Sequence, residues 1–173
     1  MSNEKPKMEK MIIGFSKAKS PFAFLSYLIR WFDDNAPFSH AYIKMHTVKY
    51  DATFIYQADF SGCHFYSEKI FLKSHTVVDE IELEITKDER DIIVGWCLKN
   101  SGANYGFINL VFLALKVVFN MKAKFGDGNK SFICSELVTE VLKIINLMNK
   151  DVCSDMVTPH ELYKFLKKED KNV

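Results

Sequence analysis

Residues 40–46, HAYIKMH, alternate along the chain with the period of a β-strand that buries one face. The preceding residues 33–39, DDNAPFS, contain Asn35 and Pro37, which interrupt regular structure. Residues 54–60 alternate in the same way, and residues 63–72 and 77–85 continue the strand-rich pattern. The middle of the chain is therefore predicted to form an antiparallel sheet.

Helical patterns lie on both sides of these strands. A short strand is predicted over residues 11–16, followed by a helix that begins at Ser20-Pro21 and ends in residues 33–37. After the sheet, Thr86 is expected to cap a helix over residues 87–100, Ser131 one over residues 132–148, and a short helix follows Thr158-Pro159. Helix, sheet and helices in this order predict an α+β fold.

Length and composition limit the organisation of the chain. At 173 residues and 48% hydrophobic residues, residues 1–173 are expected to form one domain, with residues 1–10 and 167–173 as flexible tails. The formal net charge is +1, and acidic residues are mixed with the lysines at both ends. The charge pattern therefore gives no reason to expect a nucleic-acid partner.

The four cysteines, Cys63, Cys97, Cys134 and Cys153, form no CxxC pair, and no secretory signal precedes them. This favours reduced thiols and a cytoplasmic location. A structural zinc site would need closely spaced ligands, and only Cys63 and His64 are close together, as neighbours that point apart on a strand. No metal is expected.

Residues 105–119 form the longest apolar run, interrupted by Lys116. The run is shorter than the ~20 residues needed to cross a bilayer, so a buried helix is the leading interpretation. Apolar residues lie on nearly all sides of such a helix, which must be covered by the domain, a second subunit, a lipid-like substrate or a membrane surface. Contact with a membrane or a subunit through residues 105–119 therefore stays open.

Cys134 lies in the stretch SFICSEL, residues 131–137, at the start of a predicted helix. Unpaired backbone N–H groups and the helix dipole in a first turn stabilise negative charge, so a nucleophilic thiolate is physically reasonable there. The alternative is a small core residue that packs inward with the apolar residues of the same helix.

A cysteine nucleophile needs a base, and His40 at the start of its strand is the best of the five histidines. His46, His64, His75 and His160 have no comparable catalytic context. On the next strand Gln57 shares a face with Asp59, and its side-chain oxygen could accept from the imidazole N–H and fix the tautomer. Asp59 and Glu68 are the alternatives for this orienting role.

The segments FSHAYI, IYQADFSGC, NYGF, SFICSELV and VTPHEL, in that order, resemble the permuted papain-like amidases of the YiiX/YaeF-like group. This group belongs to the NlpC-type papain-like superfamily, with lecithin retinol acyltransferases as distant relatives. The resemblance covers residues 11–166. It implies an antiparallel sheet packed against the helix that carries the nucleophile, with the histidine and its polar partner ahead of the cysteine.

The resemblance implies a triad of Cys134, His40 and Gln57, where relatives often place glutamate at the position of Gln57. It places Tyr105 in the wall of the active site, and Ser39 and Ser135 beside the triad as substrate contacts. The implied reaction is acyl transfer on a peptide or acyl substrate without a cofactor: cleavage of an amide, as in cell-wall peptides, or action on a lipid ester. The resemblance suggests a bacterial source, or delivery by a phage, and a non-catalytic binding module is the competing class.

Overall fold

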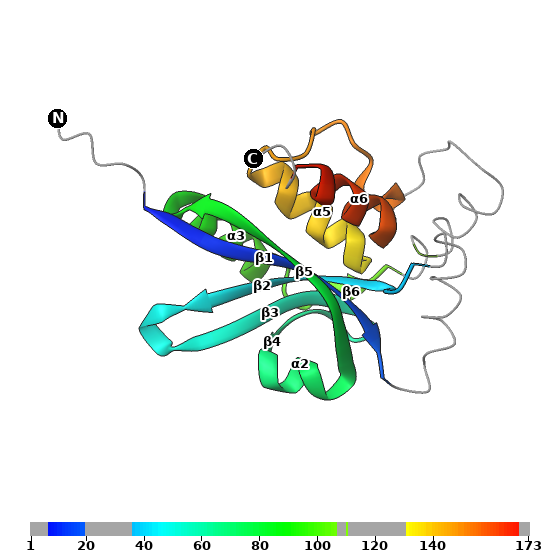
Figure 1. Ribbon diagram of the computed structural model, residues 1–173, viewed down its shortest axis with the longest axis horizontal. Coiled ribbons are helices and arrows are strands. Elements are labelled where there is room, and N and C mark those ends of the chain that lie inside the picture. The colour runs from blue at the N-terminus through cyan, green and yellow to red at the C-terminus, as the bar shows by residue number, and fades with distance from the viewer. Residues whose placement is uncertain (1–6, 20–35, 107–109, 111–130, 170–173) are drawn as a thin grey trace.

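The predicted sheet is present, and all of its strands run antiparallel. In the computed structural model, which describes residues 7–19, 36–106, 110 and 131–169, five strands lie in the order β4-β3-β2-β1-β5 (Figure 1). The strands are β1 (Met8–Ala18), β2 (His40–Thr47), β3 (Ala52–Asp59), β4 (Gly62–Ser67) and β5 (His75–Thr86). The α+β class and the antiparallel sheet are therefore confirmed.

Four helices are seen among the described residues. They are α2 (Glu68–Ser74), α3 (Lys87–Asn100), α5 (Cys134–Ile144) and α6 (Pro159–Glu169). Helix α3 begins as predicted, because the Thr86 hydroxyl accepts from the Glu89 amide at 3.2 Å while the Glu89 carboxylate accepts from the Thr86 amide at 2.8 Å. Two short strands, β6 (Asn104–Tyr105) and β7 (Ser131–Phe132), pair in parallel.

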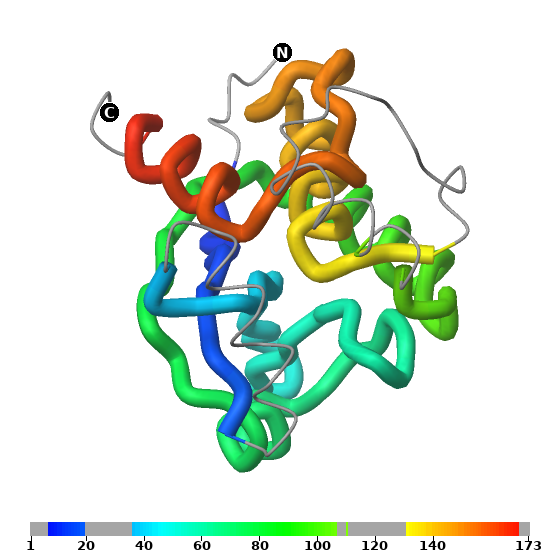
Figure 2. Tube along the Cα trace, turned by 90° about the vertical axis from the view of Figure 1, so that its right-hand side faces the viewer, coloured from blue at the N-terminus to red at the C-terminus, as the bar shows by residue number. Residues whose placement is uncertain are grey.

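The main hydrophobic core lies between one face of the sheet and helices α3, α5 and α6. Strand β2 contributes Ala41, Ile43 and Met45 to this face, since alternate residues of a strand point to the same side. Helix α5 contributes Leu137, Val138, Val141 and Leu142, all fully buried. Figure 2 shows α5 and α6 packed side by side over the strands.

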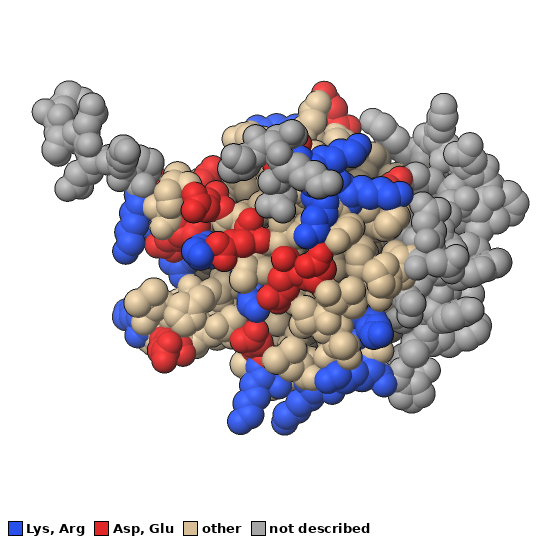
Figure 3. Space-filling model, viewed as in Figure 1, with Lys and Arg blue, Asp and Glu red and all other residues tan. Residues whose placement is uncertain are grey.

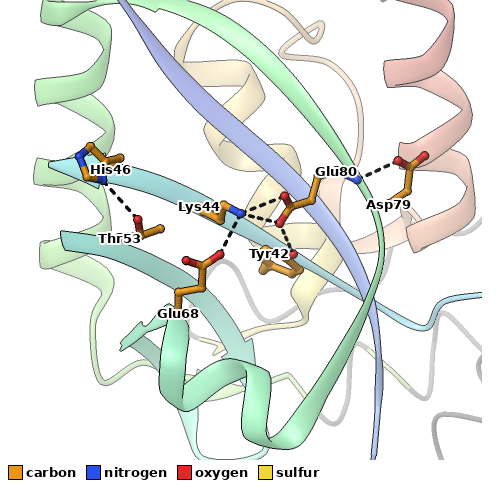
Figure 4. Close-up of polar contacts among 7 residues, drawn as sticks. All are labelled: Tyr42, Lys44, His46, Thr53, Glu68, Asp79 and Glu80. Carbon is orange, nitrogen blue, oxygen red and sulfur yellow. Dashed lines mark hydrogen bonds and ion pairs between the residues drawn. The ribbon is translucent and has the colours of Figure 1, made fainter. Parts of the chain in front are cut away.

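Helix α2 covers the opposite face of the sheet (Figure 1). There Phe71 packs on Tyr42 with ring centroids 4.6 Å apart. Beside them, Lys44 Nζ lies 2.9 Å from Glu80 and 3.0 Å from Glu68, and the Tyr42 hydroxyl donates to Glu80 at 2.7 Å (Figure 4). This network joins β2, β5 and α2.

Several sequence-based boundaries are corrected. Residues 68–72 belong to α2 rather than to a strand, because the Ser67 hydroxyl caps a helix by accepting from the Ile70 amide. Residues 8–10 and 167–169 lie in β1 and α6, so these parts of the predicted tails are ordered elements. The helix expected after Ser20-Pro21 and most of residues 105–119 lie outside the described residues.

Charged side chains of both signs are interspersed on the face of the molecule shown in Figure 3. Lys10 and Glu82 pair across β1 and β5 at 2.7 Å, and Arg90 of α3 pairs with Glu9 of β1 at 3.1 Å. Within the described ranges, no helix is both long enough and apolar enough to cross a membrane.

Candidate active site

His40, Gln57 and Asp59 form a chain of hydrogen bonds at one end of β2 and β3. His40 Nε2 lies 2.7 Å from Gln57 Oε1, and Gln57 Nε2 donates to Asp59 Oδ2 at 2.9 Å. Asp59 is itself held by the backbone amide of Ser61 at 2.8 Å. The antiparallel pairing of Ile43 with Tyr56 sets the register that brings these side chains together.

This chain determines which imidazole nitrogen can act as a base. An ionised carboxylate only accepts hydrogen bonds, so Asp59 requires the NH₂ group of Gln57 on its side. The Gln57 oxygen then faces His40 and accepts from Nε2–H, which leaves Nδ1 of the neutral ring as the acceptor. Of the three orienting candidates, Gln57 contacts His40, Asp59 orients Gln57, and Glu68 is bound to Lys44 instead.

The pKa of His40 is lowered to about 4, mainly by burial and then by the nearby His75, whereas Gln57 and Asp59 act in the opposite direction. Part of His40 remains exposed, but its ring lies against His75, with centroids 5.1 Å apart and planes 28° from parallel. His40 is therefore neutral at pH 7 and able to accept a proton.

Cys134 is the first residue of α5, with 6% of its surface exposed. The helix starts later than predicted, because Ser131 and Phe132 form β7 and Ile133 takes the N-cap position. The Glu136 carboxylate accepts from the Ile133 amide at 3.2 Å. The expected place of Cys134 in a helical first turn is thus confirmed, and Ser131 as the cap is wrong.

Tyr105 is influenced electrostatically by both Cys134 and Asp59. It lies opposite Phe132 in the β6–β7 pair, and the Gly106 amide donates to the Phe132 carbonyl at 3.0 Å, two residues before Cys134. Burial raises the pKa of Tyr105 well above its ordinary value, and both Cys134 and Asp59 add to this shift. Cys134 and Asp59 are therefore both near enough to Tyr105 to affect its pKa. Asp59 is in turn linked to His40 by hydrogen bonds through Gln57.

A close backbone approach holds β6 beside the β3–β4 turn. The Cys63 amide donates to the Ala103 carbonyl at 2.9 Å, and the Gly102 amide donates to the Cys63 carbonyl at 2.8 Å. Gly62 has φ +109°, and a Cβ at this position would lie 2.4 Å from the Ala103 oxygen. Only glycine fits this contact without displacing β6.

The two serines predicted as substrate contacts are buried, and each is the sequence neighbour of His40 or Cys134. Ser39 is 6% exposed, and its amide donates to the Ser16 carbonyl at 3.1 Å, which fixes the chain just before His40. Ser135 is fully buried, and its hydroxyl has no hydrogen-bond partner among the described residues. Their substrate contacts stay predictions.

The remaining cysteines have different surroundings from Cys134. Burial raises the pKa of both Cys63 and Cys97 to about 12. Cys153 is partly exposed, and its thiol lies 2.8 Å from Asp155 Oδ1. In the part of the chain that the structure describes, no group of three or more His, Cys, Asp or Glu side chains could hold a metal ion.

Two residues of this site have roles that differ from the expectation from the sequence. His75 has no catalytic context in the sequence, yet its ring stacks on His40, and Asp59, an alternative for the orienting role, hydrogen-bonds to Gln57 rather than to the imidazole. Both contacts depend on strand pairing, so no local sequence pattern signals them. Comparisons with known protein families and with curated proteins find no match to this chain.

Proposed function

We propose that this protein is a papain-like cysteine hydrolase that cleaves an amide bond with Cys134 as nucleophile and His40 as general base. The observation that carries the proposal is the chain from Asp59 through Gln57 to His40, which leaves Nδ1 as the basic nitrogen. The resemblance to permuted papain-like amidases supports the same assignment of roles.

In the proposed reaction, the Cys134 sulfur attacks the substrate carbonyl carbon while His40 Nδ1 takes the thiol proton. The tetrahedral intermediate collapses, the C–N bond breaks, and the amine leaves with the proton from Nδ1. Water then attacks the thioester, its proton passes to Nδ1 and on to the departing sulfur, and the acid is released. The low pKa of His40 means that the ring is neutral and ready for the first transfer at pH 7.

Backbone amides in the first turn of α5 supply the expected stabilisation of the oxyanion. Tyr105, partly buried and electrostatically influenced by Cys134, is proposed to form the wall against which the substrate lies. The Gln57 amide carries no charge, so the imidazolium formed in the first step is less stabilised than one beside a carboxylate. Proton return to the leaving amine is favoured as a result.

Alkylation by iodoacetamide at pH 6, followed for each cysteine by mass spectrometry, tests the nucleophile and its base. Cys134 should react at least about tenfold faster than the partly exposed Cys153, and His40→Ala should remove this advantage. His46→Ala, at the other end of β2, is the matched control and should leave the rate unchanged. Equal rates at Cys134 and Cys153, or no effect of His40→Ala, would sink the enzyme assignment and leave a binding module.

The substrate class is tested separately with the wild-type protein. Incubation with peptidoglycan peptides and with lipid esters, analysed by mass spectrometry, should release D-amino acid or γ-glutamyl products from the peptides. Hydrolysis or transfer of the lipid acyl chain alone would replace the amidase assignment with an acyltransferase or esterase on the same residues.

A further inference from the structure

His75 lies in a cluster of three rings on the face of the sheet that carries His40. Its ring is parallel to Phe71, with centroids 4.5 Å apart and planes within 2°, and the His40 ring lies 5.1 Å from His75 and 6.4 Å from Phe71. Phe71 in turn packs on Tyr42. The His40 ring therefore has an aromatic neighbour of fixed position rather than open solvent on this side.

An irregularity in β5 is what turns His75 toward His40. Asp79 pairs with Phe15 and Val77 pairs with the next residue, Ser16, so Val78 is an extra residue in the strand. Without it, residues 75 and 77 would point to the face of α5 and α6, where Asp79 accepts from Tyr163 at 2.8 Å. The bulge reverses the alternation, as bulges beside functional sites commonly do.

The orientation of His75 is also fixed by hydrogen bonds. The Ser74 hydroxyl lies 3.1 Å from the Phe71 carbonyl and 2.9 Å from His75 Nδ1. Because a hydroxyl has one hydrogen, which goes to the carbonyl, His75 Nδ1–H donates to Ser74 Oγ. The tautomer and the ring plane of His75 are therefore fixed independently of its contact with His40.

We propose that His75 is a positioning residue for His40, holding its ring in the plane that meets Gln57 and opposing a second positive charge beside it. This inference rests on the proposed role of His40 as the general base. It adds to that role a reason why the ring stays neutral and correctly oriented between reaction cycles.

The charges around the pair agree with this role. Among the described residues, the charged and titratable groups that act on His40 are His75 from β5 and Asp59 from β3, and Asp59 raises its pKa. Burial lowers the pKa of His75, Asp59 and the Phe71 backbone act in the opposite direction, and Lys19, just after β1, lowers it slightly further. Two imidazoles in contact cannot both become protonated without repulsion.

The test measures the pKa of His40 by NMR titration of the imidazole signals, assigned by comparison with His40→Gln. His75→Phe keeps an aromatic ring in the stack and removes the charge, so the pKa of His40 should rise by about one unit. His75→Ala removes the stack as well and should slow alkylation of Cys134 at pH 7 by about tenfold. His46→Phe changes an exposed histidine on β2, the strand that carries His40, and should change neither the pKa of His40 nor the alkylation rate.

An unchanged pKa of His40 in His75→Phe, together with an unchanged alkylation rate in His75→Ala, would overturn the proposal. If His75→Phe does not fold, His75→Gln carries the same expectation for the pKa. The titration is independent of the enzyme assignment. A shifted pKa with Cys134 insensitive to His40→Ala would reject the hydrolase and keep the contact, whereas the reverse pattern would reject the role of His75 alone.

Discussion

Gln57 presents its amide oxygen to one partner and its amide nitrogen to another, and this fixes the direction of the hydrogen bonds between His40 and Asp59. Its oxygen accepts from His40 and its nitrogen donates to Asp59, so a reversed amide would lose both bonds. The carboxylate thus influences the imidazole through a neutral group rather than by direct pairing. A carboxylate in direct contact would raise the pKa of His40 more than the Gln57 amide does.

Asp59→Asn should slow alkylation of Cys134 by roughly 10- to 100-fold at pH 7, because an asparagine can donate as well as accept and no longer forces the Gln57 oxygen toward His40. The rate is measured with iodoacetamide, and thermal unfolding shows whether the variant is folded. Asp51→Asn, in the β2–β3 connection, is the control. A wild-type rate in folded Asp59→Asn would show that the amide is oriented by other contacts.

Sequence alone predicted part of this arrangement. The even spacing of Gln57 and Asp59 placed both side chains on one face of a strand, and the position of His40 at a strand start suggested the base. The choice between Gln57, Asp59 and Glu68 required the register of β2 with β3 and the capture of Glu68 by Lys44, which are tertiary facts.

At the scale of elements, the short strands β6 and β7 join the two parts of the candidate site. Strand β7 leads directly into α5 and Cys134, while β6 carries Tyr105 and is bonded to the β3–β4 turn through Ala103. The position of Cys134 relative to Asp59 therefore depends on how closely β6 approaches this turn.

Comparing Gly62→Ala with Gly102→Ala distinguishes the effect of the close contact with β6 from the effect of a positive φ alone. Both glycines have positive φ, +109° and +85°, but only Gly62 has a backbone atom in the way of a Cβ. Each variant should lose about 1 kcal/mol of unfolding free energy from its φ, and Gly62→Ala about 1–3 kcal/mol more from the clash. Urea unfolding measures the stability, and alkylation of Cys134 should be slowed in Gly62→Ala alone. Equal effects of the two changes would argue against the close contact.

Long elements with clear period and capping residues were predicted well, as β2, β3 and α3 show. Helix α2 was missed because its seven residues continue an apolar pattern that also fits a strand, and the cap at Ser67 decided the outcome. The bulge at Val78 had no sequence signal, since it arises from the pairing of β5 with β1. The strand period alone would have placed His75 on the wrong face.

At the scale of the whole molecule, the sheet separates two environments. One face is the apolar core under α3, α5 and α6, and the other carries a small cluster of Tyr42, Ile55 and Phe71 beside His40, while Cys134 lies at the start of α5. His40 belongs to the second face, yet it is sufficiently enclosed for its protonation to matter for the stability of the entire fold.

Acid should destabilise the protein partly through His40. The pKa of His40 is lowered from 6.5 to about 4 by folding, so between these values the unfolded chain binds the proton and the folded protein does not. Stability from this source is complete above pH 6.5, falls as the pH decreases, and is lost below about pH 4, by on the order of 3 kcal/mol in total.

Urea unfolding at pH 7.5 and pH 4.5 measures this contribution. His40→Gln should lose less stability between the two pH values than the wild type by about that amount, while His46→Gln, exposed at the far end of β2, should follow the wild type. Parallel losses in His40→Gln and the wild type would mean that folding does not shift the pKa of His40.

The connection between β2 and β3 lies at the opposite end of β2 from His40. It consists of a 3₁₀ turn, Val48–Tyr50, and Asp51 with φ 44°, and Val48 is 87% exposed. At ~3.3 Å per residue, β2 separates this turn from His40 by roughly 25 Å. A fluorophore or surface tether attached at Val48 would therefore report on the protein, or immobilise it, without touching the residues proposed to react.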